Sequence, residues 1–324
     1  MYTLNSCLEI INGELEQLKD HKKEPAELYE PIYYILSLGG KRIRPVLTLM
    51  ACNLFTDDLT QAIKPALAIE VFHNFTLVHD DIMDNAALRR NQVTIHEKWN
   101  SNVAILSGDA MQIYAYQLLC ETDMPLLKKL IDIYNSTALE VCEGQQYDMN
   151  FATFEKVTLP QYIRMIELKT SVLLAASLKI GATCANASEK DSKNLYEFGR
   201  NLGLAFQIQD DYLDVYADQE IFGKTVGGDI AENKKTYLLI KALEMANPKQ
   251  AKVLTHAMTN QLPEPEKVEM VKNIFDELNI ASIARNEIQR FSDLSFCFLD
   301  LVEVDKDRKT GLRDLANDLI NRDR

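Results

Sequence analysis

The sequence predicts an all-α fold, and two observations support that prediction. The 324-residue chain contains only 12 glycines and 9 prolines, the residues that most often interrupt helices. No stretch alternates β-branched and polar residues as a half-buried strand does. The length allows one large domain or two ordinary ones. Because no convincing linker interrupts the chain, we expect a single domain over residues 1–324.

The helices can be placed in order along the chain. The first seven are expected over residues 3–20, 27–38, 46–55, 58–85, 101–120, 125–150 and 159–183. Further helices are expected over residues 238–324, separated by prolines and by a charged stretch at residues 303–309. Lys169, Thr170 and Ser171 interrupt the seventh helix, because hydroxyl side chains compete for backbone hydrogen bonds.

An acidic motif ends the helix expected over residues 58–85. It reads HDDIMD and contains Asp80, Asp81 and Asp84. At 100° per residue, Asp84 lies about 40° from Asp80 and about 60° from Asp81, so the three carboxylates share one face. Like charges so placed repel one another unless a divalent cation such as Mg²⁺ bridges them. A solvated acidic helix end would explain one such motif equally well.

The motif occurs twice. Residues 203–218, GLAFQIQDDYLDVYAD, place Asp210, Asp211 and Asp214 after a second apolar run. Two such clusters are improbable by chance. Facing each other across a helical bundle, they would bind several metal ions and a polyanion between them.

Cations accompany the acidic motifs. Gly39 and Gly40 precede Lys41, Arg42 and Arg44 in the sequence GGKRIRP. A flexible turn that delivers cations to a helix start suits a diphosphate, although a solvated basic turn is the alternative.

Two further features lie near the motifs. His73 precedes Asp80 by seven residues, about 20° away on the helical wheel. It therefore points along the carboxylate face, unless it is a satisfied core histidine. The Gly- and Lys-rich residues 223–236 form either a lid over an anion or a plain loop between helices.

Charge and cysteine usage restrict the partners. A net charge of −13 argues against nucleic acid and anionic membrane surfaces. The apolar run 171–185 is too short to span a bilayer, and the N-terminus resembles an acidic amphipathic helix rather than a signal peptide. The six cysteines are scattered without a CxxC pair, so we expect small core residues in a reducing compartment. A cytoplasmic protein without membrane insertion is expected.

Together these segments resemble the trans-isoprenyl diphosphate synthases, the polyprenyl synthetase family that includes farnesyl and geranylgeranyl diphosphate synthases. The resemblance rests on GGKRIRP, HDDIMDNAALRR, Lys169-Thr170, FQIQDDYLD and GKTVGGD, which occur in family order. It implies a single-domain helical bundle of the isoprenoid synthase type, usually a homodimer. Both aspartate clusters would face a central cavity.

The resemblance also implies roles for individual residues. About three Mg²⁺ would hold an allylic diphosphate, and their ligands would be Asp80, Asp84 and Asp210, supported by Asp81, Asp211 and Asp214. The same diphosphate would be held by Arg89, Lys169, Lys224 and Lys234. Isopentenyl diphosphate would be held by Lys41, Arg44, His73 and Arg90. Thr170 and Gln207 would sit beside the reacting carbons.

The implied activity is a Mg²⁺-dependent prenyltransferase reaction through an allylic carbocation. Isopentenyl diphosphate would condense head to tail with dimethylallyl, geranyl or farnesyl diphosphate. Phe75 and Thr76 stand five and four residues before Asp80, a large–small pattern that favours all-trans C15 to C20 products, C20 in particular. By the resemblance, Phe75 would form the floor of the tunnel that receives the growing prenyl tail. On an ideal wheel Phe75 lies nearly opposite the carboxylates, so either the helix bends or unwinds there, or neighbouring Phe72 and residues from another helix form that floor.

Three alternatives remain at this stage. A terpene cyclase would share the fold and the first motif, a non-catalytic prenyltransferase subunit would have lost one cluster, and a Ca²⁺ buffer would not need GGKRIRP. Starter preference, exact product length and physiological pathway stay open.

Overall fold

The computed structural model describes residues 1–19, 23–217, 227–259 and 262–321 and is all-α, as predicted. Within these ranges the strands are β1 (Leu88–Arg89) and β2 (Gln92–Val93), which pair antiparallel. The first helices are α1 (Leu4–Lys19), α2 (Ala26–Ser37), α3 (Ile43–Asn53), α4 (Thr60–Met83), α5 (Ile95–Lys98), α6 (Ser101–Cys120) and α7 (Met124–Thr153). The later ones are α8 (Leu159–Ile166), the π-helix η1 (Glu167–Ser171), α9 (Val172–Cys184), α10 (Glu189–Tyr216), α12 (Gly228–Ala231), α13 (Tyr237–Met245), α14 (Pro248–Thr259), α15 (Glu264–Glu277), α16 (Ile280–Asp300) and α17 (Lys306–Ile320).

Contacts divide the chain into two compact units, which are described separately. Unit one comprises residues 1–135, 176–195 and 303–312. Unit two comprises residues 136–175, 196–302 and 313–324. The expectation of one domain over the whole chain stays a prediction.

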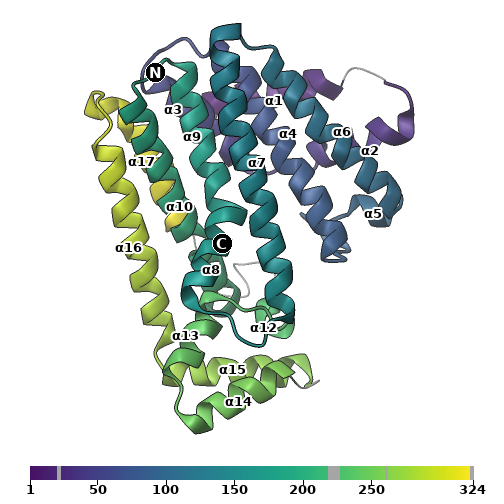
Figure 1. Cartoon of the computed structure of the whole chain (residues 1–324), viewed down its shortest axis with the longest axis vertical. Helices are drawn as coiled ribbons and strands as arrows, with labels where there is room; N and C mark the ends of the chain where they lie inside the picture. The colour runs from purple at the N-terminus through teal and green to yellow at the C-terminus, as the bar shows by residue number, and fades with distance from the viewer. Residues whose placement is uncertain (20–22, 218–226, 260–261, 322–324) are drawn as a thin grey trace. The chain divides into compact units, whose positions relative to one another are not determined.

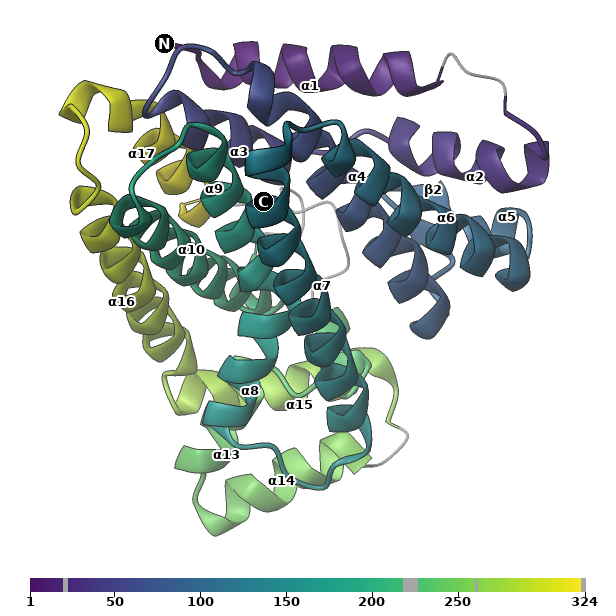
Figure 2. The same ribbon diagram turned by 45° about the horizontal axis from the view of Figure 1, so that its top comes forward.

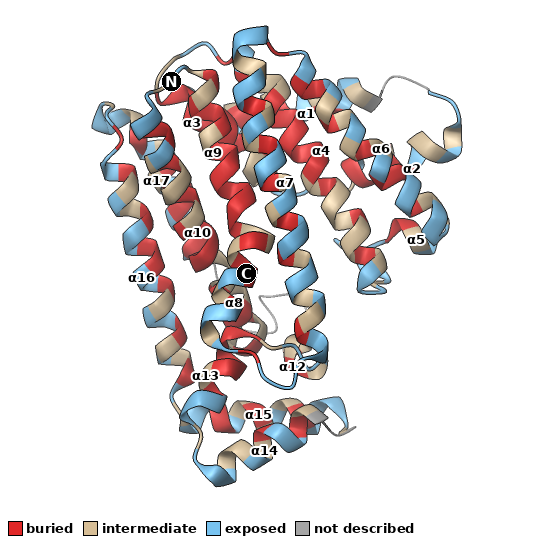
Figure 3. Ribbon diagram, viewed as in Figure 1, coloured by how far each residue is buried: buried red, intermediate tan, exposed pale blue. Residues whose placement is uncertain are grey.

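Helix α4 forms the centre of unit one. It lies beside α6 in both ribbon views (Figure 1, Figure 2) and also packs against α3. Residues 66–72 are all buried, which is the pattern of a helix surrounded by others. The helix becomes partly exposed toward its C-terminal end (Figure 3). It stops there because Asn85 adopts a left-handed conformation with φ of 50°, as residues after helix ends often do.

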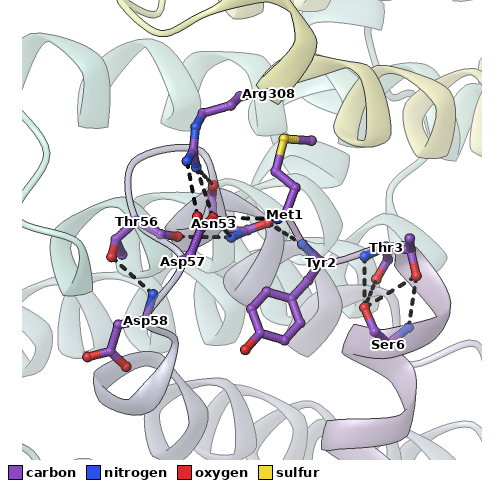
Figure 4. Close-up of polar contacts among 9 residues, drawn as sticks. All are labelled: Met1, Tyr2, Thr3, Ser6, Asn53, Thr56, Asp57, Asp58 and Arg308. Atoms are coloured by element: carbon purple, nitrogen blue, oxygen red, sulfur yellow. Dashed lines mark hydrogen bonds and ion pairs between the residues drawn. The ribbon is translucent and has the colours of Figure 1, made fainter.

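Hydrogen bonds fix the C-terminal end of α3. Asn53 accepts a bond from the Tyr2 backbone N–H at 2.8 Å and donates to the Thr56 carbonyl at 2.9 Å. Its own carbonyl accepts from Arg308 at 2.7 Å. Figure 4 shows these groups converging from three parts of the chain. The helix that follows GGKRIRP is therefore held firmly at its far end.

The π-helix η1 is the main irregularity of unit two, and it lies at the predicted interruption. It spans Glu167–Ser171, between α8 and α9. Gly144 of α7 and Gly203 of α10 approach it closely. A Cβ on Gly144 would lie 2.3 Å from the Lys169 backbone nitrogen, and one on Gly203 would lie 2.6 Å from the Ser171 Cα. Both glycines are needed because any side chain there would meet the η1 backbone.

Several sequence predictions need adjustment. Helix α3 begins at Ile43, earlier than residue 46, because proline is tolerated in a first helical turn, so Pro45 lies inside the helix. Cys7, Cys52 and Cys184 are buried as expected. The prediction of core positions is wrong for the other three, which are exposed: Cys120, Cys142 and Cys297. No described helix is both long and apolar enough to cross a bilayer.

Candidate functional site

A cationic group in unit one joins the start of α3 to α4. Arg44 Nη1 lies 3.1 Å from His73 Nε2. Burial, and then the Arg44 and Arg90 charges, hold the pKa of His73 well below its usual 6.5. The imidazole is therefore neutral, and its Nε2 accepts the hydrogen bond from the guanidinium. Burial also lowers the pKa of Arg44 to about 10. The Glu70 charge raises this pKa and the Arg90 charge lowers it further, but both effects are smaller than that of burial. An anion bound here would relieve this excess of positive charge.

Arg90 reaches the same loop from a hairpin. Arg90 and Asn91 have φ of 53° and 61°, so they form the tight turn between β1 and β2. The Arg90 guanidinium donates to the Gly39 carbonyl. Gly40 has a φ of 128°, a conformation that residues with a Cβ rarely adopt, so glycine is needed beside that guanidinium. Lys41 follows on the loop and is exposed.

The first aspartate motif lies at the end of α4. Asp81 is 2% exposed and accepts two hydrogen bonds from Arg89, through Nε at 2.8 Å and Nη2 at 2.5 Å. Burial nevertheless raises the pKa of Asp81. Arg89 Nη2 also lies 3.7 Å from Asp80 Oδ2. Asp84 is exposed. Asp81 therefore orients Arg89 and faces inward, whereas Asp80 and Asp84 remain more accessible.

The carboxylates suit Mg²⁺ in kind. Mg²⁺ takes one or two carboxylates and completes its shell with water and substrate phosphates. Among the described residues, no group of three or more His, Cys, Asp or Glu side chains could hold a metal ion. Hard oxygen donors such as Asp80 and Asp84 fit this ion. Asp80 lies beside a cation, Arg89, that would bind the same phosphate oxygens. The predicted metal ligands stay predictions.

Unit two contains a pocket at η1. Its polar lining comes from α7, η1, α10 and the residues before α13: Asp148, Lys169, Thr170, Gln207, Asp211 and Lys234. Lys169 Nζ lies 2.6 Å from Asp148 Oδ2, and Thr170 Oγ1 donates to Gln207 Oε1 at 3.0 Å. Five side chains that the sequence analysis singled out thus share one pocket: Lys169, Thr170, Gln207, Asp211 and Lys234.

Asp211 and Asp214 bind backbone and hydroxyl groups of unit two. Asp211 is 4% exposed and accepts from the Tyr162 hydroxyl at 2.5 Å and from the Tyr237 N–H at 2.9 Å. Asp214 accepts from the Asp229 N–H at 3.1 Å. Burial, and then the Asp229 carboxylate, raise the pKa of Asp211 to about 7 and that of Asp214 to about 6. This part of the motif carries more negative charge than its surroundings neutralise.

Lys234 offsets some of that charge. Its Nζ lies 3.4 Å from Asp229. Burial alone would lower the pKa of Lys234, but Asp229 and Asp211 outweigh burial and raise it. Lys234 is therefore a permanent cation in a pocket lined by carboxylates. Asp210 is half-buried on α10, and Lys224 lies outside the described residues.

Phe75 and Thr76 lie on an unbroken stretch of α4. The Phe75 ring meets Phe72 at 5.6 Å and His79 at 4.7 Å between ring centroids. Thr76 Oγ1 donates to the His73 carbonyl at 2.8 Å. The helix does not unwind at Phe75. Phe72 lies beside Phe75, which the alternative of a floor that includes Phe72 requires. Their influence on product length stays a prediction.

Some residues of these sites escaped the sequence analysis. Tyr162 gave no signal because nothing in its local sequence sets it apart. Asp229 ends the GKTVGGD motif, but no role was expected for it. Asp148 ends a polar run on an otherwise apolar helix, and it too was given no role. Glu70 could have been noticed as the one acidic residue within the apolar run 66–72.

Comparisons with known proteins show the family of the chain. The profile of a family described as polyprenyl synthetase matches residues 25–278. A geranylgeranyl diphosphate synthase of Methanosarcina mazei is 42% identical over 222 residues, 68% of each chain. The crystal structure of a geranylgeranyl pyrophosphate synthase is 44% identical with a TM-score of 0.94, and the match covers 99% of both chains. A polyprenyl synthase of Caulobacter crescentus, complexed with calcium and isoprenyl diphosphate, is 26% identical, with a TM-score of 0.88 and coverage of 99% and 97%.

Proposed function

Because the chain belongs to the polyprenyl synthetase family, we propose that it condenses isopentenyl diphosphate with an allylic diphosphate, head to tail. The proposed product is an all-trans C20 diphosphate, as the names of its relatives indicate. One observation supports this most strongly. Each unit holds a cluster of carboxylates beside cations, the combination that an ionising diphosphate requires.

The residues of unit two would stabilise the charges that form when the allylic C–O bond breaks. The allylic C1–O bond ionises, and the bonding electrons leave with the diphosphate. Lys169 and Lys234, which both line the pocket, would bind the departing oxygens. Mg²⁺ bound to the second aspartate motif would supply further positive charge to that leaving group. Thr170 and Gln207 form a hydrogen-bonded pair in the same pocket, and their oxygen atoms would stabilise the cationic carbon.

The residues of unit one bind the substrate that does not ionise. Arg44, His73 and Arg90 would hold the diphosphate of isopentenyl diphosphate. Its double bond attacks the allylic C1, a new C–C bond forms, and a proton leaves to the released diphosphate. Neutral His73 donates through Nδ1–H while its Nε2 keeps Arg44 in place.

A homodimer is part of the proposal. Leu106 and Ile113 of α6 are 60% and 59% exposed, and they lie seven residues apart, about 20° on the helical wheel. Ile105 beside them is also exposed. Sedimentation of the protein and of a Leu106→Glu variant tests this surface. A monomeric wild type, or an unchanged dimer in the variant, would remove α6 as the interface.

Product analysis tests the reaction itself. Purified protein is incubated with Mg²⁺, labelled isopentenyl diphosphate and each of the three allylic starters, and the dephosphorylated products are separated by chromatography. A C20 alcohol and the loss of product with EDTA are expected. A cyclase would consume the allylic substrate without incorporating label, and a non-catalytic subunit would do neither.

A further inference from the structure

Arg42 is the most deeply buried of the three cations in GGKRIRP. It is 7% exposed, whereas its neighbour Lys41 is exposed. Its Nη1 donates to Glu70 Oε1 at 2.5 Å, and its Nη2 donates to the Leu36 carbonyl at 2.6 Å. Both terminal nitrogens of this guanidinium bond other groups of the protein, so Arg42 is not expected to bind a substrate. We therefore expect a structural role for its charge.

Glu70 is an unusual partner, because it lies within the apolar centre of α4. It is 1% exposed, and Asn74, one turn later, donates to its Oε1 at 2.9 Å and to its carbonyl at 2.8 Å. A carboxylate that is paired and bonded in this way has a single orientation. Burying two charges costs more solvation than a hydrophobic contact of the same size, so the pair is a poor means of stabilisation. It does impose a specific geometry.

The backbone at Arg42 points to the same role. Arg42 caps α3 in the left-handed region, with φ of 48° and ψ of 33°, which residues with a Cβ rarely adopt. Such conformations persist where the surroundings enforce them. Here the ion pair holds one side of the loop and Arg90, bound to Gly39, holds the other.

The pair stands next to the cationic group already described. Arg44 follows Arg42 by two residues, and His73 follows Glu70 by three, which places it on the same side of α4. Two contacts thus connect the start of α3 with α4. The buried one joins Arg42 to Glu70, and the more accessible one joins Arg44 to His73.

We propose that Arg42 and Glu70 are positioning residues: their buried ion pair sets the separation of α3 and α4 and thereby the spacing of Arg44 and His73. The inference rests on the proposed function, because that spacing matters when the two side chains bind the diphosphate of isopentenyl diphosphate. Neither Arg42 nor Glu70 touches the substrate.

Two variants separate positioning from mere stability. Glu70→Gln keeps the shape and leaves the Arg42 charge unpaired. The double variant Arg42→Met with Glu70→Leu removes both charges and restores apolar packing, which often recovers stability. Glu14→Gln is the matched control, because Glu14 of α1 pairs at 3.3 Å with Lys64 of α4, the helix that carries Glu70, and both side chains are partly exposed.

The expected effect of the variants is on KM for isopentenyl diphosphate. Glu70→Gln and the double variant should both raise KM for isopentenyl diphosphate about tenfold or more, while KM for the allylic substrate stays within about twofold. The double variant should do so with a melting temperature near that of the wild type, and Glu14→Gln should match the wild type. A double variant with normal KM, or a Glu70→Gln variant that changes only the melting temperature, would overturn the inference.

Direct binding makes the result independent of turnover. Calorimetric titration with isopentenyl diphosphate, without Mg²⁺, should show about tenfold weaker binding to Glu70→Gln than to the wild type. A wild type that binds the probe but forms no product would refute the proposed function alone. A wild type that does not bind it would refute this inference as well.

Discussion

Replacing Gly144 with alanine should uncouple catalysis from stability. The added Cβ would lie 2.3 Å from the Lys169 nitrogen and 2.6 Å from the Leu168 carbonyl carbon, both backbone atoms of η1. Ordinary contact begins at 3.4 Å, so the two segments must separate by about 1 Å. Backbone cannot move aside as the end of a flexible side chain can. The displaced segment carries Lys169 and Thr170.

The two expected effects differ in size. Alanine gains about 1 kcal/mol of helix propensity over glycine in α7, whereas overpacking costs about 1–3 kcal/mol. The net loss of folding free energy is therefore about 0–2 kcal/mol. A 1 Å misplacement of positioned groups, by contrast, lowers turnover about 100-fold.

Urea denaturation and steady-state kinetics measure the two effects side by side. Gly13→Ala is the matched control, because Gly13 lies in α1 with nothing within 4 Å of an added Cβ. It should gain about 1 kcal/mol of stability and keep wild-type turnover. If folded Gly144→Ala keeps turnover within about twofold of the wild type, the close approach of α7 to η1 does not position Lys169.

Three further predictions concern the remaining residues. Asp80→Asn and Asp210→Asn should each reduce turnover about 100- to 1,000-fold at saturating substrate, because each removes charge that binds the metal ions; near-normal turnover in either variant would exclude that residue from the metal site. In steady-state kinetics, Arg44→Ala should mainly raise KM for isopentenyl diphosphate, and Lys169→Ala should mainly lower kcat. The reverse pattern would mean that the two diphosphate subsites are exchanged. Phe75→Ala should lengthen the products by one or more C5 units in product chromatography while the protein stays folded; unchanged products with a lower melting temperature would identify Phe75 as core packing.

The helices were predictable from sequence because their patterns are local. The helix expected over residues 101–120 is α6, and the interruption expected at residues 169–171 lies within η1. Helix propensity and competition by hydroxyl groups both act over a few residues, so the sequence alone records them.

The inner part of the site was harder to predict, because its contacts join residues far apart in sequence. Tyr162 bonds Asp211, 49 residues later, and the sequence around it gives no hint of this. The three cations of GGKRIRP look equivalent in sequence. Only the packing of α3 on α4 assigns Arg42 to the interior and leaves Lys41 exposed.

The second aspartate motif has a consequence for building chimeric enzymes. Asp214 holds the N–H of Asp229, and Asp211 holds the N–H of Tyr237. The two side chains are thus the anchor points of a short stretch of main chain that carries Lys234. Because the anchored groups are backbone amides, which every residue except proline supplies, residues 229–237 can take the side chains of a relative without losing either anchor. Replacing Asp211 or Asp214 would instead release the main chain that carries Lys234.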